Sequence, residues 1–139
     1  MIKPIIIDAQ TLWMVAEDEP EAVRMAIRDL QKDWYKVIGV PPLIVNELPS
    51  GWDKPVLALG QDAYRLAGLK RPEYPGAESY RLEVHHDSVV LVSGADLRGC
   101  IYGIYGFSEH VLGVDPQYYW TDNEPEFCGQ LSLPAYWRF

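Results

Sequence analysis

The feature that most constrains this fold is an amphipathic stretch of sequence close to the N-terminus. Its apolar residues recur at spacings of four, three, four and three, which is one face of a helix running to about Ile38. They are Val23, Ile27, Leu30, Trp34 and Val37. A helix with one apolar face must bury that face against another layer, so we expect a layered domain.

The ends of this helix also carry signals. Asp18 is the candidate N-cap, and Pro20 suits the first turn, where its missing N–H is not needed. Gly39, followed by Pro41 and Pro42, ends the helix.

Short apolar runs on both sides of the helix are typical of β-strands. The run from Val56 to Leu59 is wholly apolar, which indicates a strand buried on both faces. Apolar residues alternate with charged ones from Tyr80 to Val84, and a polar turn follows at His85-His86-Asp87. This pattern predicts a hairpin. A short helix is expected after Asp62. The predicted strands are Pro4–Asp8, Leu12–Ala16, Leu43–Leu48, Val56–Leu59, Ser79–Val84 and Ser88–Val92.

A second long helix is predicted from about Arg98 to Leu112, with Asp96 as its cap and Gly113 after its end. Gly103 and Gly106 each cost about 1 kcal/mol relative to alanine in a helix. We expect that these two glycines let the helix lie close against the sheet. The predicted inner face is Ile101, Ile104, Tyr105, Ser108, Val111 and Leu112.

Together these elements predict an α+β fold in one domain. We expect a single mixed β-sheet with two long helices and one short helix packed mainly on one face. The other face of the sheet would then be either solvated or covered by another domain. A chain of 139 residues is long enough to bury such a core, for which Trp13, Trp34 and Phe107 are candidates.

Charge and composition argue against several partners. The net charge is −8 and no Lys/Arg cluster offsets it, so nucleic acid and anionic membranes are poor partners. No run of about 18 apolar residues is present. Cys100 and Cys128 show no CxxC spacing, and we expect neither a metal nor a cofactor. Five Trp and nine Tyr exceed what the core alone needs.

The last third of the chain carries a motif. From Val89 it reads VVLVSGADLRGCIYGIYGFSEHVLGVDPQYYWTDNEP. This resembles the N-terminal domain of glycoside hydrolase family 115, the xylan α-1,2-glucuronidases, which has "GSD", "KRGTIYGIY", "SE", "GV" and a Trp-containing aromatic cluster in the same order. The departures are Leu97 for lysine and Cys100 for threonine. The matching residues are Gly94, Asp96, Arg98, Gly99, Ile101, Tyr102, Gly103, Ile104, Tyr105, Ser108, Glu109, Gly113, Val114, Tyr119, Trp120, Asp122 and Pro125.

The resemblance implies a role. A related helix motif occurs in accessory domains of other glycosidases, including hexosaminidases, so we expect a hexosaminidase domain 2-like fold at residues 1–125. Residues 126–139 would lead toward a (β/α)₈ catalytic barrel that holds the catalytic carboxylates. The chain alone would then be no enzyme, while the parent would be an inverting, α-glucuronidase-like hydrolase acting on hemicellulose such as xylan. A secreted or periplasmic location also follows from the resemblance.

Two candidate substrate-binding positions stand out, each with a structural alternative. The aromatic cluster Tyr118, Tyr119 and Trp120 can stack on sugar rings or pack against the barrel. A stand-alone carbohydrate-binding module using this cluster is the alternative function. Arg98 can bind a sugar carboxylate, or it can tie neighbouring elements together by pairing with a carboxylate or a loop carbonyl.

No catalytic residue is assigned. Asp96 and Asp122 are a nominal carboxylate pair, but a helix cap and a turn explain them better. The histidines at 85, 86 and 110 lack the spacing of a metal-ligand set.

Overall fold

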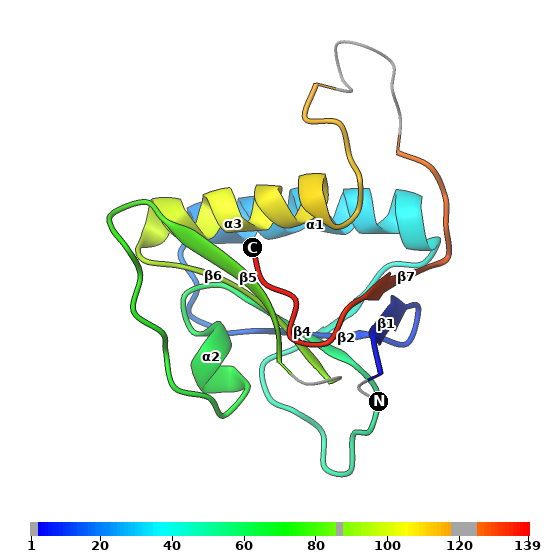
Figure 1. Cartoon of the computed structure of the whole chain (residues 1–139), viewed down its shortest axis with the longest axis horizontal. Coiled ribbons are helices and arrows are strands. Elements are labelled where there is room, and N and C mark those ends of the chain that lie inside the picture. The colour runs from blue at the N-terminus through cyan, green and yellow to red at the C-terminus, as the bar shows by residue number, and fades with distance from the viewer. Residues whose placement is uncertain (1–2, 86–87, 118–124) are drawn as a thin grey trace.

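The computed structural model describes residues 3–85, 88–117 and 125–139 of the chain. It contains two layers, with the long helices above a sheet (Figure 1). The elements in chain order are β1 (Ile5–Asp8), β2 (Leu12–Val15), α1 (Glu21–Ile38), β3 (Leu43–Val45), β4 (Val56–Leu59), α2 (Ala63–Leu66), β5 (Tyr80–His85), β6 (Val89–Gly94), α3 (Leu97–His110) and β7 (Gln130–Leu133).

Five of these strands form the main sheet, in the order β3-β2-β4-β6-β5. The strands from β3 to β6 in this order are parallel, and β5 is antiparallel to β6 at the edge, as the predicted hairpin requires. Every residue of β2 and β4 is buried, which confirms the interpretation of the apolar run after Pro55. The mixed sheet and its helices confirm the predicted α+β class.

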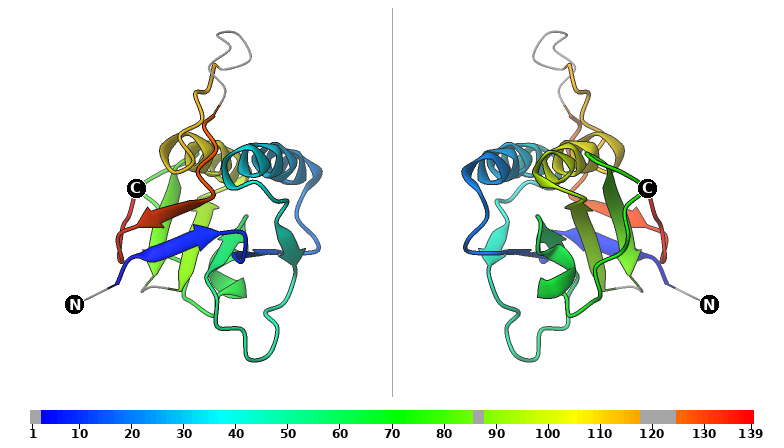
Figure 2. Two further views of the ribbon diagram at one scale, coloured as in Figure 1. Left: turned by 90° about the vertical axis from the view of Figure 1, so that its right-hand side faces the viewer. Right: turned by 90° about the vertical axis from the view of Figure 1, so that its left-hand side faces the viewer.

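Both long helices cover the same face of the sheet and lie side by side (Figures 1 and 2). The apolar face of α1 is buried as predicted, from Val23 through Val37. The ring of Trp34 meets that of Trp13 on β2 edge to face, with centroids 5.3 Å apart. Phe107 of α3 is buried in the same core, so all three aromatic core candidates are confirmed.

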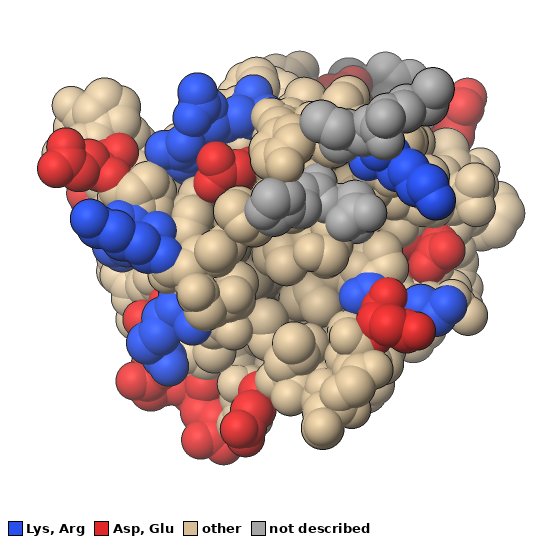
Figure 3. Space-filling view, turned by 60° about the horizontal axis from the view of Figure 1, so that its bottom comes forward, with Lys and Arg blue, Asp and Glu red and all other residues tan. Residues whose placement is uncertain are grey.

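The short helix α2 lies on the opposite face (Figure 1). There Ala63 and Tyr64 pack with Leu12, Met14 and Ala58 in a second apolar cluster. This part of the sheet is therefore neither solvated nor left for another domain, because β2 and β4 are apolar on both faces and the domain covers both itself. Seen from the end of the molecule away from α1 and α3, acidic and basic side chains are mixed around the margin and uncharged residues occupy the middle (Figure 3).

The strand β1 does not join the main sheet, which corrects the expectation of a single one. It pairs antiparallel with β7 in a separate two-stranded sheet, with Ile5 opposite Leu133. Ile5 and Ile7 are buried in the core under the helices. The pairing joins the two ends of the described chain, so no local sequence pattern could reveal it.

The C-terminal residues extend the main sheet beyond β5. The backbone N–H of Leu82 donates to the carbonyl of Phe139 at 3.1 Å, and the N–H of Phe139 donates back at 2.8 Å. The N–H of Val84 donates to the carbonyl of Trp137 at 2.7 Å. Residues 126–139 thus pack against the domain as far as Phe139, and their continuation toward a barrel stays a prediction.

The predicted ends of α1 are half right. Gly39 ends the helix in the left-handed conformation at φ 98°, and its N–H donates to the carbonyl of Tyr35. At the other end the N-cap is Pro20 and no side chain caps the helix, so the assignment of Asp18 was wrong. The helix begins at Glu21, too far along the chain for Asp18 to reach its first amides.

The start of α3 is held against the sheet by Asp96, the predicted cap. One oxygen of Asp96 accepts from the N–H of Gly99 at 2.8 Å, and the other accepts from the N–H of Glu78 at 2.9 Å. A side chain at Gly99 would overlap the carbonyl of Ser79, and Gly106 lies against the ring of Tyr80. The glycines therefore allow the close approach that the sequence predicts.

One residue of the predicted inner face of α3 was misplaced. Ile104 and Ser108 are buried as expected, but Tyr105 is exposed. The face that meets the sheet is centred instead on Cys100, Ile104 and Phe107, because α3 is rotated toward β5 and β6 by its glycine contacts.

We expect the substitution Gly99→Ala to lower the free energy of unfolding by about 1–3 kcal/mol. Alanine is the better helix former, so the loss must come from the overlap with the Ser79 carbonyl. Gly76→Ala is the matched control, since open space surrounds that glycine, and it should change stability by less than about 0.5 kcal/mol. Denaturant unfolding of both variants measures this, and equal stabilities would contradict the close contact.

Candidate functional site

The carboxyl edge of the parallel strands is the first place to look for a site. β2 leads through α1 to β3 on one side, while β4 leads through α2 and β5 to β6 on the other. The strand order therefore reverses between β2 and β4. Open sheets with parallel strands commonly bind ligands in the crevice outside such a reversal.

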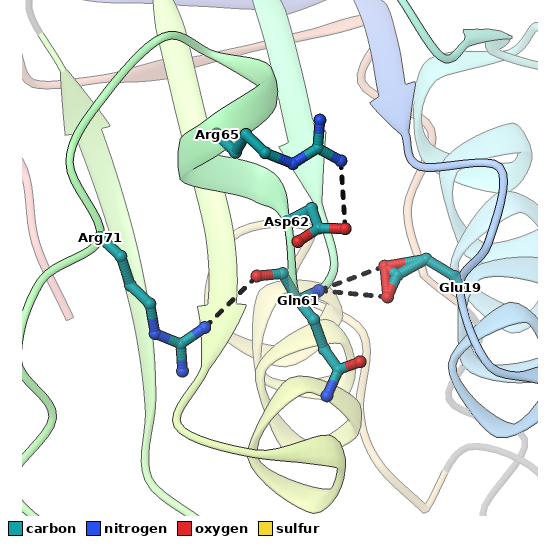
Figure 4. Close-up of polar contacts among 5 residues, drawn as sticks. All are labelled: Glu19, Gln61, Asp62, Arg65 and Arg71. Atoms are coloured by element: carbon teal, nitrogen blue, oxygen red, sulfur yellow. Dashed lines mark hydrogen bonds and ion pairs between the residues drawn. The ribbon is translucent and has the colours of Figure 1, made fainter.

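Glu19 occupies this position, reaching from the segment after β2 to the turn after β4 (Figure 4). Only 6% of the residue is exposed. Its two carboxylate oxygens accept from the N–H of Gln61 at 3.2 and 3.3 Å. Gly60 has φ 106°, and any side chain there would overlap the carboxylate. Burial raises the pKa of Glu19, against the opposing effect of the Gln61 N–H, and the nearby charges of Asp62 and Asp18 add to the rise.

The surrounding polar groups are bonded within the chain. Arg65 pairs with Asp62 at 3.1 Å, and Arg71 donates to the carbonyl of Gln61 at 3.4 Å (Figure 4). Arg71 also donates to the carbonyls of Gly94 and Ala95 at 3.1 and 2.9 Å. These contacts form a junction that ties the entry of α1 to the β4–α2 turn. This arrangement supports the fold, and sequence reasoning missed it because Glu19 and Gln61 are far apart in the chain.

We expect Glu19→Gln to stabilise the protein at neutral pH relative to the unsubstituted chain. The folded pKa of Glu19 lies above its ordinary 4.5, so its ionisation lowers stability as the pH rises from about 4.5 through the folded value. Glutamine retains an acceptor for the Gln61 N–H and carries no charge. Unfolding free energies over a pH series should show the advantage of the variant shrinking toward acid pH. An advantage that grows on acidification would contradict the cause assigned to the shift.

Arg98, a predicted substrate-binding residue, lies at the exposed start of α3. Its guanidinium pairs with the carboxylate of Glu78 at 3.0 Å. Asp96, next to it, has a lowered pKa because the N–H groups of Glu78 and Gly99 donate to its carboxylate. The structure thus supplies the partner that the structural interpretation of Arg98 requires. Asp122, the nominal partner of Asp96 in catalysis, lies outside the described residues.

The histidines and cysteines that the structure describes belong to no metal-ligand group. His110 contacts Glu109 at 3.2 Å and stacks on Phe139, with ring centroids 4.1 Å apart. Over residues 3–85, 88–117 and 125–139, no group of three or more His, Cys, Asp or Glu side chains could hold a metal ion. Cys100 is buried, which raises the pKa of its thiol to about 11, and Cys128 is exposed. Within the same ranges, no helix is long and apolar enough to cross a membrane.

A tyrosine-lined pocket of about 420 Å³ lies between α1, α3 and the segment that follows α3. Its walls include the rings of Tyr80, Tyr102 and Tyr105. Asp29 and Glu109 supply carboxylates. Tyr102 and Tyr105 are 48% and 45% exposed, so much of both rings is open to solvent. A ligand can stack on such flat rings and donate hydrogen bonds to the carboxylate oxygens beside them.

Two hydrogen bonds fix the pocket by crossing from α3 to α1. The hydroxyl of Tyr105 donates to a carboxylate oxygen of Asp29 at 2.5 Å. Below it, the hydroxyl of Ser108 donates to Asp33, also at 2.5 Å, in a buried contact. Burial, and next the charge of Glu109, raise the pKa of Tyr80, so its hydroxyl stays protonated. The pocket is thus built on two packed helices.

The predicted aromatic cluster Tyr118, Tyr119 and Trp120 lies outside the described residues. The described chain reaches the rim of the pocket at Asp115 and Pro116, just before that cluster in the sequence. The pocket itself was not predicted from the sequence. The signal was the spacing of Tyr102 and Tyr105 by three residues, which puts both on one helical face.

Comparisons with known proteins identify the fold. No protein-family model matches the sequence, and no curated protein matches it. A solved structure described as a novel family GH115 4-O-methyl-α-glucuronidase, with specificity for decorated arabinogalactans, matches with a TM-score of 0.80 at 22% identity. One described as CpGH84D matches with 0.57 at 15%, and a glycoside hydrolase family 20 β-N-acetylglucosaminidase with 0.47 at 19%.

These matches cover nearly all of this chain but little of the matched ones. The GH115 match covers 97% of this chain and 18% of the matched chain. The CpGH84D match covers 98% of this chain and 22% of the matched chain. The family 20 match covers 97% of this chain and 18% of the matched chain. The first two establish a fold that also occurs in those larger proteins.

Proposed function

We propose that this chain is a non-catalytic accessory domain of a polysaccharide-degrading glycoside hydrolase, which packs on the catalytic barrel and shapes its cleft. The observation that carries the proposal is the fold likeness, with a TM-score of 0.80 over 97% of the chain, to a protein described as a GH115 α-glucuronidase. The resemblance of the α3 motif to that family also supports it.

The surface expected to dock is the outer side of the helix layer. Met25 and Tyr35 of α1 and Tyr102 and Tyr105 of α3 are large side chains exposed on these helices. Tyrosine and methionine are enriched at protein interfaces, because they offer a broad contact area. An exposed aromatic surface on a rigid layer is suited to packing against another domain.

Two of the described acids have roles in the fold that are consistent with a non-catalytic domain. Asp96 at the start of α3 and Glu19 at the carboxyl edge of the sheet accept hydrogen bonds from backbone N–H groups of the domain itself. Glycoside hydrolysis needs a proton donor and a second carboxylate on either side of a sugar. We therefore place the general acid and base of the parent outside this chain, in an inverting, α-glucuronidase-like barrel acting on decorated hemicellulose such as xylan.

A second candidate is direct binding of glycan, and the tyrosine-lined pocket is the observation that favours it. Pyranose rings stack on aromatic faces, and carboxylates accept their hydroxyls. This candidate predicts saturable quenching of intrinsic fluorescence by xylo-oligosaccharides and its loss in the Tyr102→Ala variant. The first candidate predicts no such titration with the isolated chain.

The test of the first candidate is to read the coding sequence beyond the Phe139 codon and to produce its product with and without residues 1–139. We expect a barrel-patterned run of about 250 residues. It should hydrolyse uronic-acid-decorated xylan or arabinogalactan, while residues 1–139 alone release no sugar. Sedimentation of the two separate polypeptides should show a complex.

Variants locate the docking surface. Tyr102→Asp should weaken the complex about tenfold or more, because it places a charge in an aromatic interface. Leu48→Asp is the control, since Leu48 is also an exposed apolar residue but lies on a loop away from the helix layer. A downstream sequence without a barrel pattern, or a barrel that does not bind residues 1–139, would contradict the proposal.

A further inference from the structure

We propose that the chain beyond Phe139 continues as a strand on the open edge of β5, and that its second residue pairs with Tyr80. This inference rests on the proposed function, in which the chain leads on into a catalytic barrel, and adds how the two domains are joined. A strand bonded to the sheet would hold the following domain in a fixed orientation, whereas a free linker would not.

Residues 137–139 already run along β5 in an antiparallel register (Figure 1). The N–H of Leu82 donates to the carbonyl of Phe139 at 3.1 Å, and the N–H of Phe139 donates back at 2.8 Å. The N–H of Val84 donates to the carbonyl of Trp137 at 2.7 Å. The contacts step in opposite directions along the two segments, so they define one register that can be continued past Phe139.

This register makes Tyr80 the next residue of β5 whose backbone groups point outward. In an antiparallel strand, residues that bond to one side alternate with residues that bond to the other side. Both backbone groups of Leu82 are used by Phe139, so the N–H and the carbonyl of Tyr80, two residues earlier, face the same way. Within the described ranges of the chain, neither group has a hydrogen-bond partner on this side of β5. The second residue after Phe139 falls opposite this gap.

The open part of the edge is short and has a defined end. Glu78 has φ 60°, so the extended conformation of β5 begins only after it. The N–H of Glu78 is already bonded to Asp96, and the carbonyl of Ser79 accepts from the N–H of Ala95 on the inner side. The extension is therefore limited to one further pair, made of two hydrogen bonds with Tyr80.

The opposite edge of the sheet is less suited to the addition of a strand. There β3 has three residues, and Pro41 and Pro42 come directly before it. Short edge strands and prolines are usual means by which proteins prevent such an addition. β5 has six residues and no proline, and the C-terminal residues pair only with its part from Leu82 to Val84.

The register also predicts the side chains of the added residues. The ring of Phe139 stacks on that of Tyr80, with centroids 6.3 Å apart, and the Tyr80 ring lies against α3. Trp137 stacks on the same Phe139 ring, while Arg138 between them is exposed. The second residue after Phe139 would share the side of the two aromatic rings and lie opposite Tyr80. We expect it to be apolar or aromatic, because such cross-strand pairs are favourable, and the first residue to be polar.

Hydrogen exchange followed by NMR tests the pairing at the amide of Tyr80. In residues 1–139 that amide should exchange at least about tenfold faster than the amide of Leu82, because it faces solvent. In a polypeptide that also includes the residues coded directly after Phe139, we expect the Tyr80 amide to exchange about tenfold or more slowly than in residues 1–139. The amide of Leu82 should stay protected in both polypeptides, which shows that the fold is intact.

Two proline substitutions in the longer polypeptide form a matched pair. A proline at the second residue after Phe139 replaces the N–H that would donate to the Tyr80 carbonyl, so protection of the Tyr80 amide should be lost. A proline at the first residue after Phe139 replaces an N–H that points away from β5, so the protection should remain.

Several results would overturn the proposal. The Tyr80 amide could be as protected as that of Leu82 in residues 1–139, or exchange equally fast in both polypeptides. The two prolines could have equal effects, or a proline could already be coded at the second position. Protection of Tyr80 in residues 1–139 that rises with protein concentration would assign the edge to a second copy of the chain instead.

The outcome is separable from that of the proposed function. A barrel that docks on residues 1–139, while the Tyr80 amide stays open in the longer polypeptide, would overturn the added strand and leave the docking role standing. A protected Tyr80 amide in a polypeptide whose downstream sequence has no barrel pattern would support the strand and contradict the docking role.

Discussion

The contact between the start of α3 and the start of β5 is the constraint on which the rest of the structure depends. Asp96 joins the N–H of Gly99 to the N–H of Glu78, and Gly99 brings the helix backbone against the carbonyl of Ser79. This contact sets the rotation of α3 about its axis. With that rotation fixed, Phe107 enters the core and Tyr102 faces outward into the pocket. A helix held farther away would provide neither.

The elements that could be predicted from the sequence are those with local signals. The apolar face of α1 follows from the spacing of its residues, and the Asp96 cap from its place before an apolar helix. The pairing of β1 with β7 could not be predicted, because it joins the two ends of the described chain. The exposure of Tyr105 was missed for a related reason, since helical spacing does not say which way a helix with glycines will be rotated.

The candidate site was harder to predict than the fold. Glu19 belongs to a run of acids that is typical of a helix start, yet tertiary structure buries it over the turn at Gln61. The pocket brings together Asp29 and Tyr105 from two helices, so only their packing creates it. Arg98 was singled out from a motif, and the structure pairs it with Glu78, a loop residue that the motif does not contain.

The glycine-bearing face of α3 lies flush on the sheet, and the two cysteines report on this packing directly. Cys100 is buried on that face, while Cys128 is exposed. Alkylation of the native protein, followed by intact mass, should modify Cys128 quickly and Cys100 only at the rate of unfolding. The variant Cys128→Ser should therefore stay unlabelled until denaturant is added. Rapid labelling of Cys100 in that variant under native conditions would contradict the packing of α3.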